Sequence, residues 1–201
     1  MTCVKRITSL TDLDRDNIRI QTQRLSLRIL RPEDVTQDYI SGINDPEVNY
    51  YLLEVKRTRQ TFESLKFFVS ENAQSPSNLL FGIFFNHSNQ LIGTLRLTGI
   101  SFFHYCLGVG ICIFAKQYWG KGYALESLLR VKEFVFHEMG MHYMEAGAYG
   151  QNAASVKLFE RAGFECYLKT SDKYRLDNKF VEVLMFKAVN PNFNFEFQEI
   201  K

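Results

Sequence analysis

The chain has 201 residues, of which 46% are hydrophobic and 23% charged, and its formal net charge is +2. This length predicts one domain whose core needs no disulfide or metal to hold it, and the share of charged residues excludes wholesale disorder. The near balance of 24 basic and 22 acidic residues argues against a nucleic-acid-binding protein, which usually carries a clear basic excess.

Alternating apolar residues predict strands, and apolar stripes at helical spacing predict helices. In chain order the expected elements are a strand over 23–30, a helix over 31–40, a helix over 57–73, strands over 79–85, 91–97 and 105–114, a helix over 123–139, a strand over 142–149, a helix over 152–162, and strands over 164–170 and 179–188. This order is typical of the α+β class, with a mixed sheet and helices on both faces.

The regions around this core are expected to be peripheral. Residues 1–20 form a loose lead-in to a single domain over 21–188, and residues 189–201 form a tail. In the tail, phenylalanines alternate with polar residues, which predicts an edge strand or a contact in a homodimer. These phenylalanines are Phe193, Phe195 and Phe197.

Cysteine spacing and hydropathy predict a soluble cytoplasmic protein without a membrane partner. The four cysteines form no Cys-x-x-Cys pair, so they fit free thiols in a reducing compartment. The charged first 16 residues leave no apolar stretch of a secretory signal. The longest apolar run, 108–115, is far shorter than the ~20 residues that a membrane span needs. The cysteines are Cys3, Cys106, Cys112 and Cys166.

Two glycines, Gly120 and Gly122, lie between a predicted strand and a predicted helix. Glycine admits positive φ and lets a ligand approach the backbone, and the N–H groups of such a loop and helix start can bind a pyrophosphate. A plain tight turn would explain the glycines equally well. The spacing fits neither the P-loop, which needs Ser or Thr after Gly-Lys, nor the dinucleotide motif, which needs a third glycine.

Asn152 begins a predicted helix, and Ser155 lies in its first turn. An asparagine there can cap the helix and also offer its amide to a neighbour, and a cap alone remains the alternative. In the preceding helix, Glu126 is expected on the solvent face. His137 and His142 lack the spacing of a zinc helix, so no metal site is predicted.

The span 110–163 resembles the GNAT superfamily of N-acetyltransferases. Gln117-x-x-Gly120-x-Gly122 is similar to the loop with which that family binds the pyrophosphate of acetyl-CoA. Residues 119–126 resemble the branch that includes ribosomal-protein and spermidine acetyltransferases. The run from Asn152 to Gly163-Phe164 resembles a later signature of the family, and the order of elements matches over about 20–188.

The resemblance implies a mostly antiparallel sheet that is splayed between strands 105–114 and 142–149, with a bulge in the first. The pantetheine arm of acetyl-CoA would lie in the gap, and backbone N–H groups would stabilise the charge that develops on the thioester oxygen. The amine would attack the thioester directly. The implied cofactor-binding residues are Ile111, Cys112, Ile113, Gln117, Tyr118, Trp119, Gly120, Lys121, Gly122, Tyr123, Ala124, Asn152, Ser155 and Phe159.

Such a reaction needs a group that takes a proton from the amine. Glu145, His104 and Glu54 are candidates, and each could equally be an ordinary surface residue. Many family members have Tyr where this chain has Phe159, which cannot protonate the leaving thiolate. Tyr149, Tyr167 or water would then serve, or the thiolate leaves unassisted. The candidate catalytic residues are Glu145, His104, Tyr149 and Asn152.

The expected acceptor is a small primary amine such as a nucleotide-linked amino sugar, because residues 80–83 and 91–97 resemble members that acetylate amino sugars. A protein N-terminus of the ribosomal-protein alanine type is the alternative, and mixed charges over 31–60 and 98–105 argue mildly against a polyamine. A basic cluster over 56–59 is either a solvated face or a dock for an anionic acceptor. A non-catalytic module that binds acyl-CoA also stays open.

Overall fold

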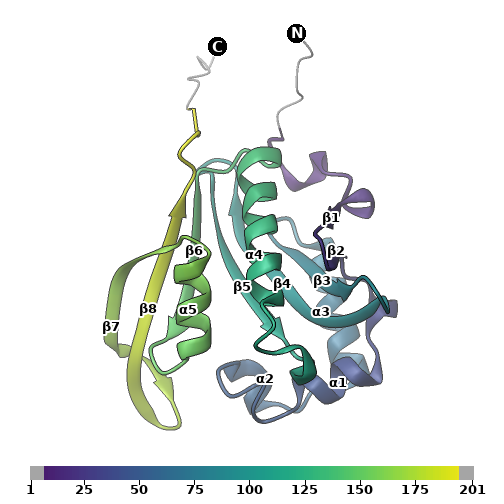
Figure 1. Cartoon of the computed structure of the whole chain (residues 1–201), viewed down its shortest axis with the longest axis vertical. Coiled ribbons are helices and arrows are strands. Elements are labelled where there is room, and N and C mark those ends of the chain that lie inside the picture. The colour runs from purple at the N-terminus through teal and green to yellow at the C-terminus, as the bar shows by residue number, and fades with distance from the viewer. Residues whose placement is uncertain (1–6, 195–201) are drawn as a thin grey trace.

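The computed structural model describes residues 7–194, which form one eight-stranded sheet with helices on both faces (Figure 1). The strand order is β1-β2-β3-β4-β5-β6-β8-β7, and among neighbouring pairs only β5 and β6 run parallel. The strands are β1 (Arg19–Gln21), β2 (Leu25–Ile29), β3 (Leu79–Phe85), β4 (Gln90–Ser101), β5 (Cys106–Ile113), β6 (Tyr143–Tyr149), β7 (Glu165–Leu176) and β8 (Lys179–Val189). The predicted α+β class and mixed, mostly antiparallel sheet are confirmed.

The helices divide into two groups that bury opposite faces of the sheet. They are α1 (Gln37–Ile43), α2 (Leu53–Arg57), α3 (Phe62–Gln74), α4 (Tyr123–Glu133), which continues into a π-helical turn (Phe134–Glu138), and α5 (Ala153–Arg161). Leu128 and Val131 of α4 are fully buried in one apolar core together with Phe159 of α5. A second core contains Tyr39 of α1, whose ring stacks on Phe114 at 4.5 Å between centroids. Thus α4 and α5 share one face, while α1 and α3 pack in the second core.

The sheet opens between its two parallel strands. Pairing joins Cys106 to Gly108 with Tyr143 to Glu145 and stops there, although β5 continues to Ile113 and β6 continues to Tyr149. The predicted splay is therefore present. The predicted bulge in β5 is wrong, because β5 pairs without interruption with β4 from Gly108 to Ile113, and the register shift lies between Thr98 and Ser101 of β4. Divergence of the strands, and not a bulge, leaves the far edge of β5 free.

Several element boundaries differ from the prediction. The expected helix over 31–40 is a short 3-10 turn (Pro32–Asp34) followed by α1, because Thr36 caps a new helix by accepting from the N–H of Tyr39. The helix expected over 57–73 is α3, which begins only at Phe62 because Thr61 caps it by accepting from the N–H of Ser64, whereas Arg57 ends the separate helix α2. The turn expected over 172–178 is mostly strand, and the hairpin turns at Asp177 and Asn178, which have positive φ.

The two ends of the chain also depart from expectation. Within the described part of the lead-in, Leu10 is buried in the core, and the Arg15 guanidinium donates to the carbonyl oxygens of Ala73 and Ser75 at 2.7 Å each. This segment is docked and not loose. Phe193 lies outside any strand and packs against His142, whereas the predicted roles of Phe195 and Phe197 lie outside the described residues.

Candidate functional site: a cavity through the splayed sheet

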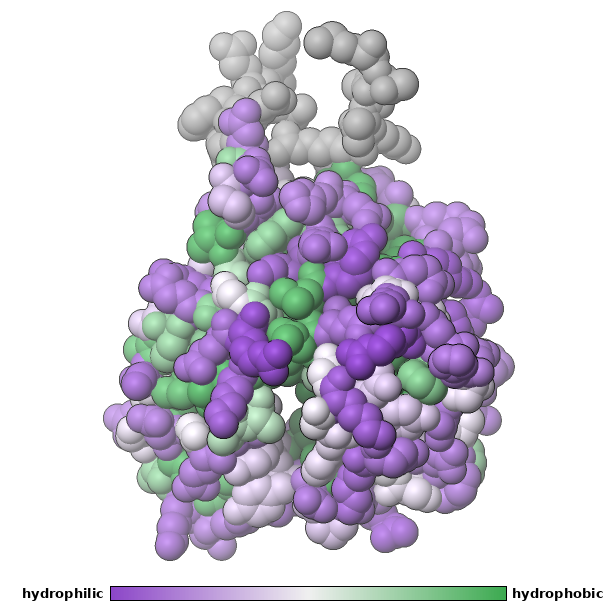
Figure 2. All heavy atoms as spheres, in the orientation of Figure 1, coloured by the Kyte–Doolittle hydropathy of each residue, from purple (hydrophilic) through white to green (hydrophobic). Residues whose placement is uncertain are grey.

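The gap between β5 and β6 leads into a cavity of about 920 Å³. Its walls come from both halves of the sheet and from α4 and α5, and Figure 2 shows the molecule hollowed in this region. The lining includes Ile111, Cys112 and Ile113 of β5, Trp119, Gly120 and Gly122 of the loop between β5 and α4, Tyr149 of β6, and Asn152, Ser155 and Phe159 near or on α5. A volume of this size suits a cofactor-sized organic ligand.

The glycine loop closes one end of the cavity with backbone groups. Gly120 and Gly122 have φ of +71° and +81°, and a Cβ at Gly120 would meet no atom within 4 Å. Gly122 is the N-cap of α4, so the first N–H groups of that helix have no partner within the helix. Open space beside a positive-φ backbone and a helix N-terminus favours a bound anion there.

An ion pair fixes this loop from a distant part of the chain. Glu126 accepts from the Thr22 hydroxyl at 2.5 Å and from the Arg24 backbone N–H at 2.9 Å, and it pairs with the Arg24 guanidinium at 2.6 Å. Arg24 also donates to the carbonyl oxygen of Lys121 at 3.0 Å. Glu126 is therefore not the solvent-facing residue that helical periodicity predicts. Partial burial alone would raise the pKa of Glu126, but the hydrogen bonds from Thr22 and Arg24 outweigh it and lower the pKa.

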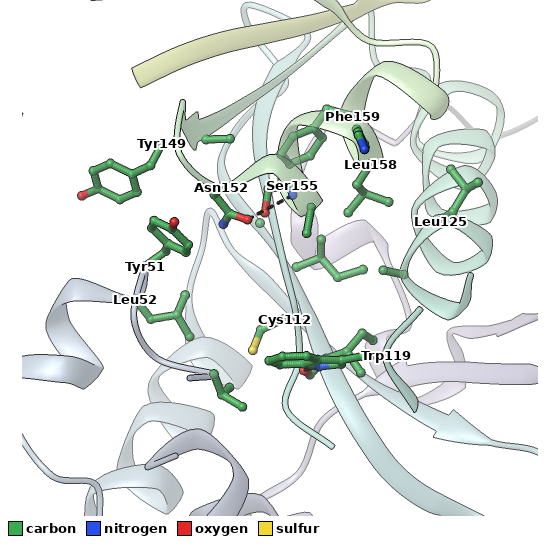
Figure 3. A pocket seen from close by; sticks show the side chains of 18 of the residues that line it. Tyr51, Leu52, Cys112, Trp119, Leu125, Tyr149, Asn152, Ser155, Leu158 and Phe159 are labelled. Carbon is green, nitrogen blue, oxygen red and sulfur yellow. Dashed lines mark hydrogen bonds between the residues drawn. The ribbon is translucent and has the colours of Figure 1, made fainter. Parts of the chain in front are cut away.

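The free edge of β5 faces the cavity. The Trp119 indole N–H donates to the carbonyl oxygen of Ile113 at 2.6 Å. Since backbone polar groups alternate between the two edges of a strand, the N–H and C=O of Ile111 face the same edge. Cys112 lies beside Trp119 in Figure 3, and burial raises the pKa of its thiol to about 12, so this cysteine stays protonated and does not act as a nucleophile.

Asn152 caps α5 and also lines the cavity. Its side-chain oxygen accepts from the N–H of Ser155 at 3.2 Å, the contact drawn in Figure 3. In the described part of the chain no hydrogen bond uses its side-chain NH₂ group. Phe159, in contrast, is 3% exposed and packs against Phe164 and Phe186 with centroids 5.6 and 5.5 Å away. The position of Asn152 fits both a helix cap and a residue that offers its amide to a ligand.

The structure separates the candidate catalytic residues. Tyr149 and Asn152 line the cavity, but Glu145, His104 and Glu54 do not. Glu145 sits where β5 and β6 are still paired and accepts from the Tyr167 hydroxyl, so Tyr167 is also away from the cavity. His104 is exposed in the β4–β5 turn, beyond the closed end of the splay.

Among the expected cofactor residues, Gln117 and Lys121 are exposed and do not line the cavity. Lys121 contributes its backbone carbonyl, which Arg24 holds. The remaining residues of that set all line it. Burial and the neighbouring Tyr174 raise the pKa of Tyr149, so this phenol keeps its proton.

Sequence reasoning missed a wall that the segment between α1 and α2 provides. Glu47, Val48, Tyr51 and Leu52 all line the cavity. Glu47 is the one carboxylate among the lining residues of the described chain, and it accepts from the Lys116 ammonium at 3.2 Å. A lone glutamate before a short helix carries no local signal, because its place in the cavity depends on how α1 packs against the sheet.

Within 7–194, no group of three His, Cys, Asp or Glu side chains is placed to hold a metal ion. In the same range, no helix combines the length and apolar character needed to cross a membrane. The cysteines of this range are free thiols: Cys106, Cys112 and Cys166.

Comparison with known families decides the assignment. The family model described as acetyltransferase (GNAT) domain matches residues 24–165, more than half of the chain. The chain belongs to this family. The predicted GNAT resemblance and the assignment to the N-acetyltransferases are thus confirmed.

Individual GNAT relatives agree with this result. The chain is 32% identical over 123 residues to the probable N-acetyltransferase YjcK of Bacillus subtilis. The aligned part covers 58% of this chain and 61% of that relative. It is 24% identical over 177 residues to the uncharacterized N-acetyltransferase p20 of Bacillus licheniformis, covering 85% and 95%.

Solved structures show the same fold. A spermidine N-acetyltransferase from Vibrio cholerae, in complex with CoA and spermine, superposes with a TM-score of 0.76 at 20% identity, over 86% of this chain and 99% of that one. A ribosomal-protein-S5-alanine acetyltransferase from Vibrio fischeri superposes with a TM-score of 0.69 at 16% identity, over 89% and 100%.

Proposed function

We propose that this GNAT protein transfers an acetyl group from acetyl-CoA to a small primary amine. The observation that carries the proposal is a single cavity that begins at a backbone anion site and runs through the splay between β5 and β6. It combines a glycine loop at a helix N-terminus, a free strand edge and a wall from the segment between α1 and α2. An enzyme that joins an acyl-CoA to an amine needs places for the phosphates, for the pantetheine arm and for the amine.

The cofactor end fits acetyl-CoA by its donor set. The loop around Gly120 and Gly122 offers N–H groups to the pyrophosphate, and the free edge of β5 offers backbone groups to the amide-bearing pantetheine arm. The cationic side chains of the lining, Lys157 and Arg161, both lie on α5, on the same side of the sheet as the glycine loop. Their charge favours the phosphates of the cofactor at this side.

When bound, acetyl-CoA supplies a thioester whose carbonyl carbon accepts the amine: a C–N bond forms, the C–S bond breaks, the amine loses one proton and the thiolate gains one. The N–H of Ile111 on the free edge of β5 would stabilise the charge that develops on the carbonyl oxygen. Tyr149, a protonated phenol in the lining of the cavity, would donate the proton to the thiolate. Glu47 would take the amine proton through water.

The acceptor expectations from the sequence stay predictions at this point. A nucleotide-linked amino sugar, a ribosomal-protein N-terminus and a polyamine all carry the primary amine that the reaction needs. Neighbours of similar fold are named for spermidine and for a ribosomal protein. The cytoplasmic location and the homodimer expected from the sequence also stay predictions.

Thermal unfolding in the presence of ligands tests the proposal. A ligand that binds the native state raises the unfolding midpoint by mass action. Acetyl-CoA and CoA should raise it, ADP-ribose should not, and a subsequent screen of amines should find one that releases CoA. Tight acetyl-CoA binding with no CoA release from any amine would favour the non-catalytic module, and no shift at about a millimolar would contradict the proposal.

A further inference from the structure

The acceptor side of the cavity is walled by tyrosines from three distant parts of the chain. Tyr51 precedes α2, Tyr149 ends β6 and Tyr174 lies on β7, and all three line the cavity. The rings of Tyr51 and Tyr149 stack with centroids 5.7 Å apart and an interplanar angle of 27°. Figure 3 shows these two rings side by side, away from Leu125 and Leu158 on the cofactor side.

The rest of this wall is apolar and open. Leu52 and Val48 come from the same segment as Tyr51, and Val183 and Met185 come from β8. Gly110 lines the floor, and a Cβ at this position would meet no atom within 4 Å. The wall therefore offers apolar area and aromatic faces to a ligand.

Among the described residues, the cavity lining has few charged side chains, and on the acceptor side it has neither an unpaired carboxylate nor a cation. The carboxylate of Glu47 is paired with Lys116 at 3.2 Å, and the cations Lys157 and Arg161 lie on α5, across the sheet from Tyr51. A polyamine would need unpaired carboxylates along its length, and a nucleotide-linked sugar would need cations for its diphosphate. The lining on the acceptor side provides neither.

A bridge joins the β7–β8 turn to α2 and to the segment before it, next to the tyrosines. Asp177, in the β7–β8 turn, accepts from the Tyr50 hydroxyl at 2.7 Å and from the Lys56 ammonium at 2.5 Å. Tyr50 packs edge-on against Tyr51 with centroids 4.8 Å apart. Because Tyr50 contacts Tyr51, this bridge supports the wall that Tyr51 forms.

We infer that the acceptor is an arylalkylamine, a small primary amine that a short aliphatic chain joins to an aromatic ring. Its ring packs against Tyr51 and Tyr149, and its amine reaches the thioester beside Ile111. An aromatic ring gains both apolar burial and ring-to-ring contact in this place. The inference rests on the proposed function, because it assumes that acetyl-CoA fills the α4–α5 side of the cavity.

Initial rates of CoA release with acetyl-CoA and a panel of amines test the inference. The panel contains 2-phenylethylamine, n-butylamine as its ringless counterpart, spermidine and a nucleotide-linked amino sugar. We expect kcat/KM for 2-phenylethylamine to exceed each of the others at least tenfold. A higher kcat/KM for spermidine or the amino sugar would overturn the inference. So would acetyl-CoA binding in calorimetry without turnover of 2-phenylethylamine, whereas failure to bind acetyl-CoA would overturn the proposed function itself.

Variants of Tyr51 locate the selectivity. Tyr51→Ala should lower kcat/KM for 2-phenylethylamine about tenfold and for n-butylamine less than threefold, with unchanged acetyl-CoA affinity. Tyr51→Phe keeps the ring and should retain the wild-type preference. Phe67→Ala is the matched control, because Phe67 is a 64% exposed aromatic residue outside the cavity. An equal loss with both amines would overturn the assignment to Tyr51, and the substrate comparison in the wild type decides even if Tyr51→Ala does not fold.

Discussion

The two ends of the cavity are built from different parts of the polypeptide. The proposed cofactor end uses the backbone of one contiguous segment, in which Gly120 and Gly122 adopt positive φ before α4. The proposed acceptor end uses side chains from segments that are far apart, with Tyr51 stacked on Tyr149. A backbone site can serve any side-chain sequence that keeps the glycines, whereas a side-chain wall can be changed residue by residue. In the proposed function, the backbone end therefore holds the cofactor and the side-chain end selects the acceptor.

The largest expected effect is on kcat, through substitution of Tyr149, the proposed proton donor. Tyr149→Phe removes the hydroxyl and keeps the ring, so kcat should fall about a hundredfold while acetyl-CoA affinity stays the same. Steady-state kinetics with the amine found in the screen and calorimetry with acetyl-CoA check this. An unchanged kcat would mean that the thiolate leaves unassisted, and Tyr149 would then belong to the wall alone.

The support of the cofactor end should show the next largest effect. Glu126→Ala removes a partner of Arg24 and Thr22, so we expect the free energy of unfolding to fall by about 2 kcal/mol and acetyl-CoA to bind more weakly. Urea unfolding and calorimetry measure the two changes. Glu133→Ala is the control on the same helix, since its pair with Arg130 is 3.7 Å long and exposed, and it should cost less than about 1 kcal/mol. Equal effects of both variants would contradict the supporting role of Glu126.

Asn152 lies between the two ends, and two substitutions separate its two roles. Asn152→Ala loses the cap on Ser155 and should cost about 1 kcal/mol of stability. Asn152→Asp keeps an oxygen that accepts from this N–H but loses the amide NH₂. If the NH₂ group contacts a ligand, this variant should be as stable as the wild type but less active. Full activity in Asn152→Asp would show that Asn152 is only a cap.

The smallest expected effect concerns the bridge beside the acceptor end. Hydrogen bonds from Lys56 and Tyr50 lower the pKa of Asp177 below its ordinary 3.8. A lowered native pKa stabilises the fold at pH values above the unfolded pKa, and this contribution is lost as the pH falls through the native pKa. Wild type should therefore be slightly more stable than Asp177→Asn at pH 7, and the difference should shrink below about pH 4. Urea unfolding at several pH values measures it, and a difference independent of pH would argue against the charged bridge.

Local sequence signals predicted the glycine loop before α4, because its geometry is local. Glycines before a helix permit a positive φ, and a helix N-terminus follows from the sequence pattern next to it. Most strands along the chain were equally readable from alternating apolar residues, whereas β1 was not. The same reasoning placed Glu126 in solvent, because helical periodicity contains no information about Arg24, which is 102 residues earlier in the chain.

The acceptor end could not be predicted from local patterns. Tyr51 and Tyr174 sit in segments without a motif, and they meet Tyr149 only because β5 and β6 diverge and because the β7–β8 hairpin reaches back to Tyr50. Glu145 is on the expected strand, but its position relative to the point of divergence decides that it stays outside the cavity. These positions depend on tertiary packing, about which the spacing of residues along the chain gives no information.

Calorimetric titration of acetyl-CoA into two glycine variants tests the central claim most directly. Gly120 and Gly140 both have positive φ and both have free space where a Cβ would be, but only Gly120 lines the cavity. Substitution by Glu should therefore strain both backbones similarly, and only Gly120→Glu should place a carboxylate at the phosphate-binding end. The account predicts that Gly140→Glu binds acetyl-CoA like the wild type and that Gly120→Glu binds at least tenfold more weakly. Equal affinity in the two variants would contradict it.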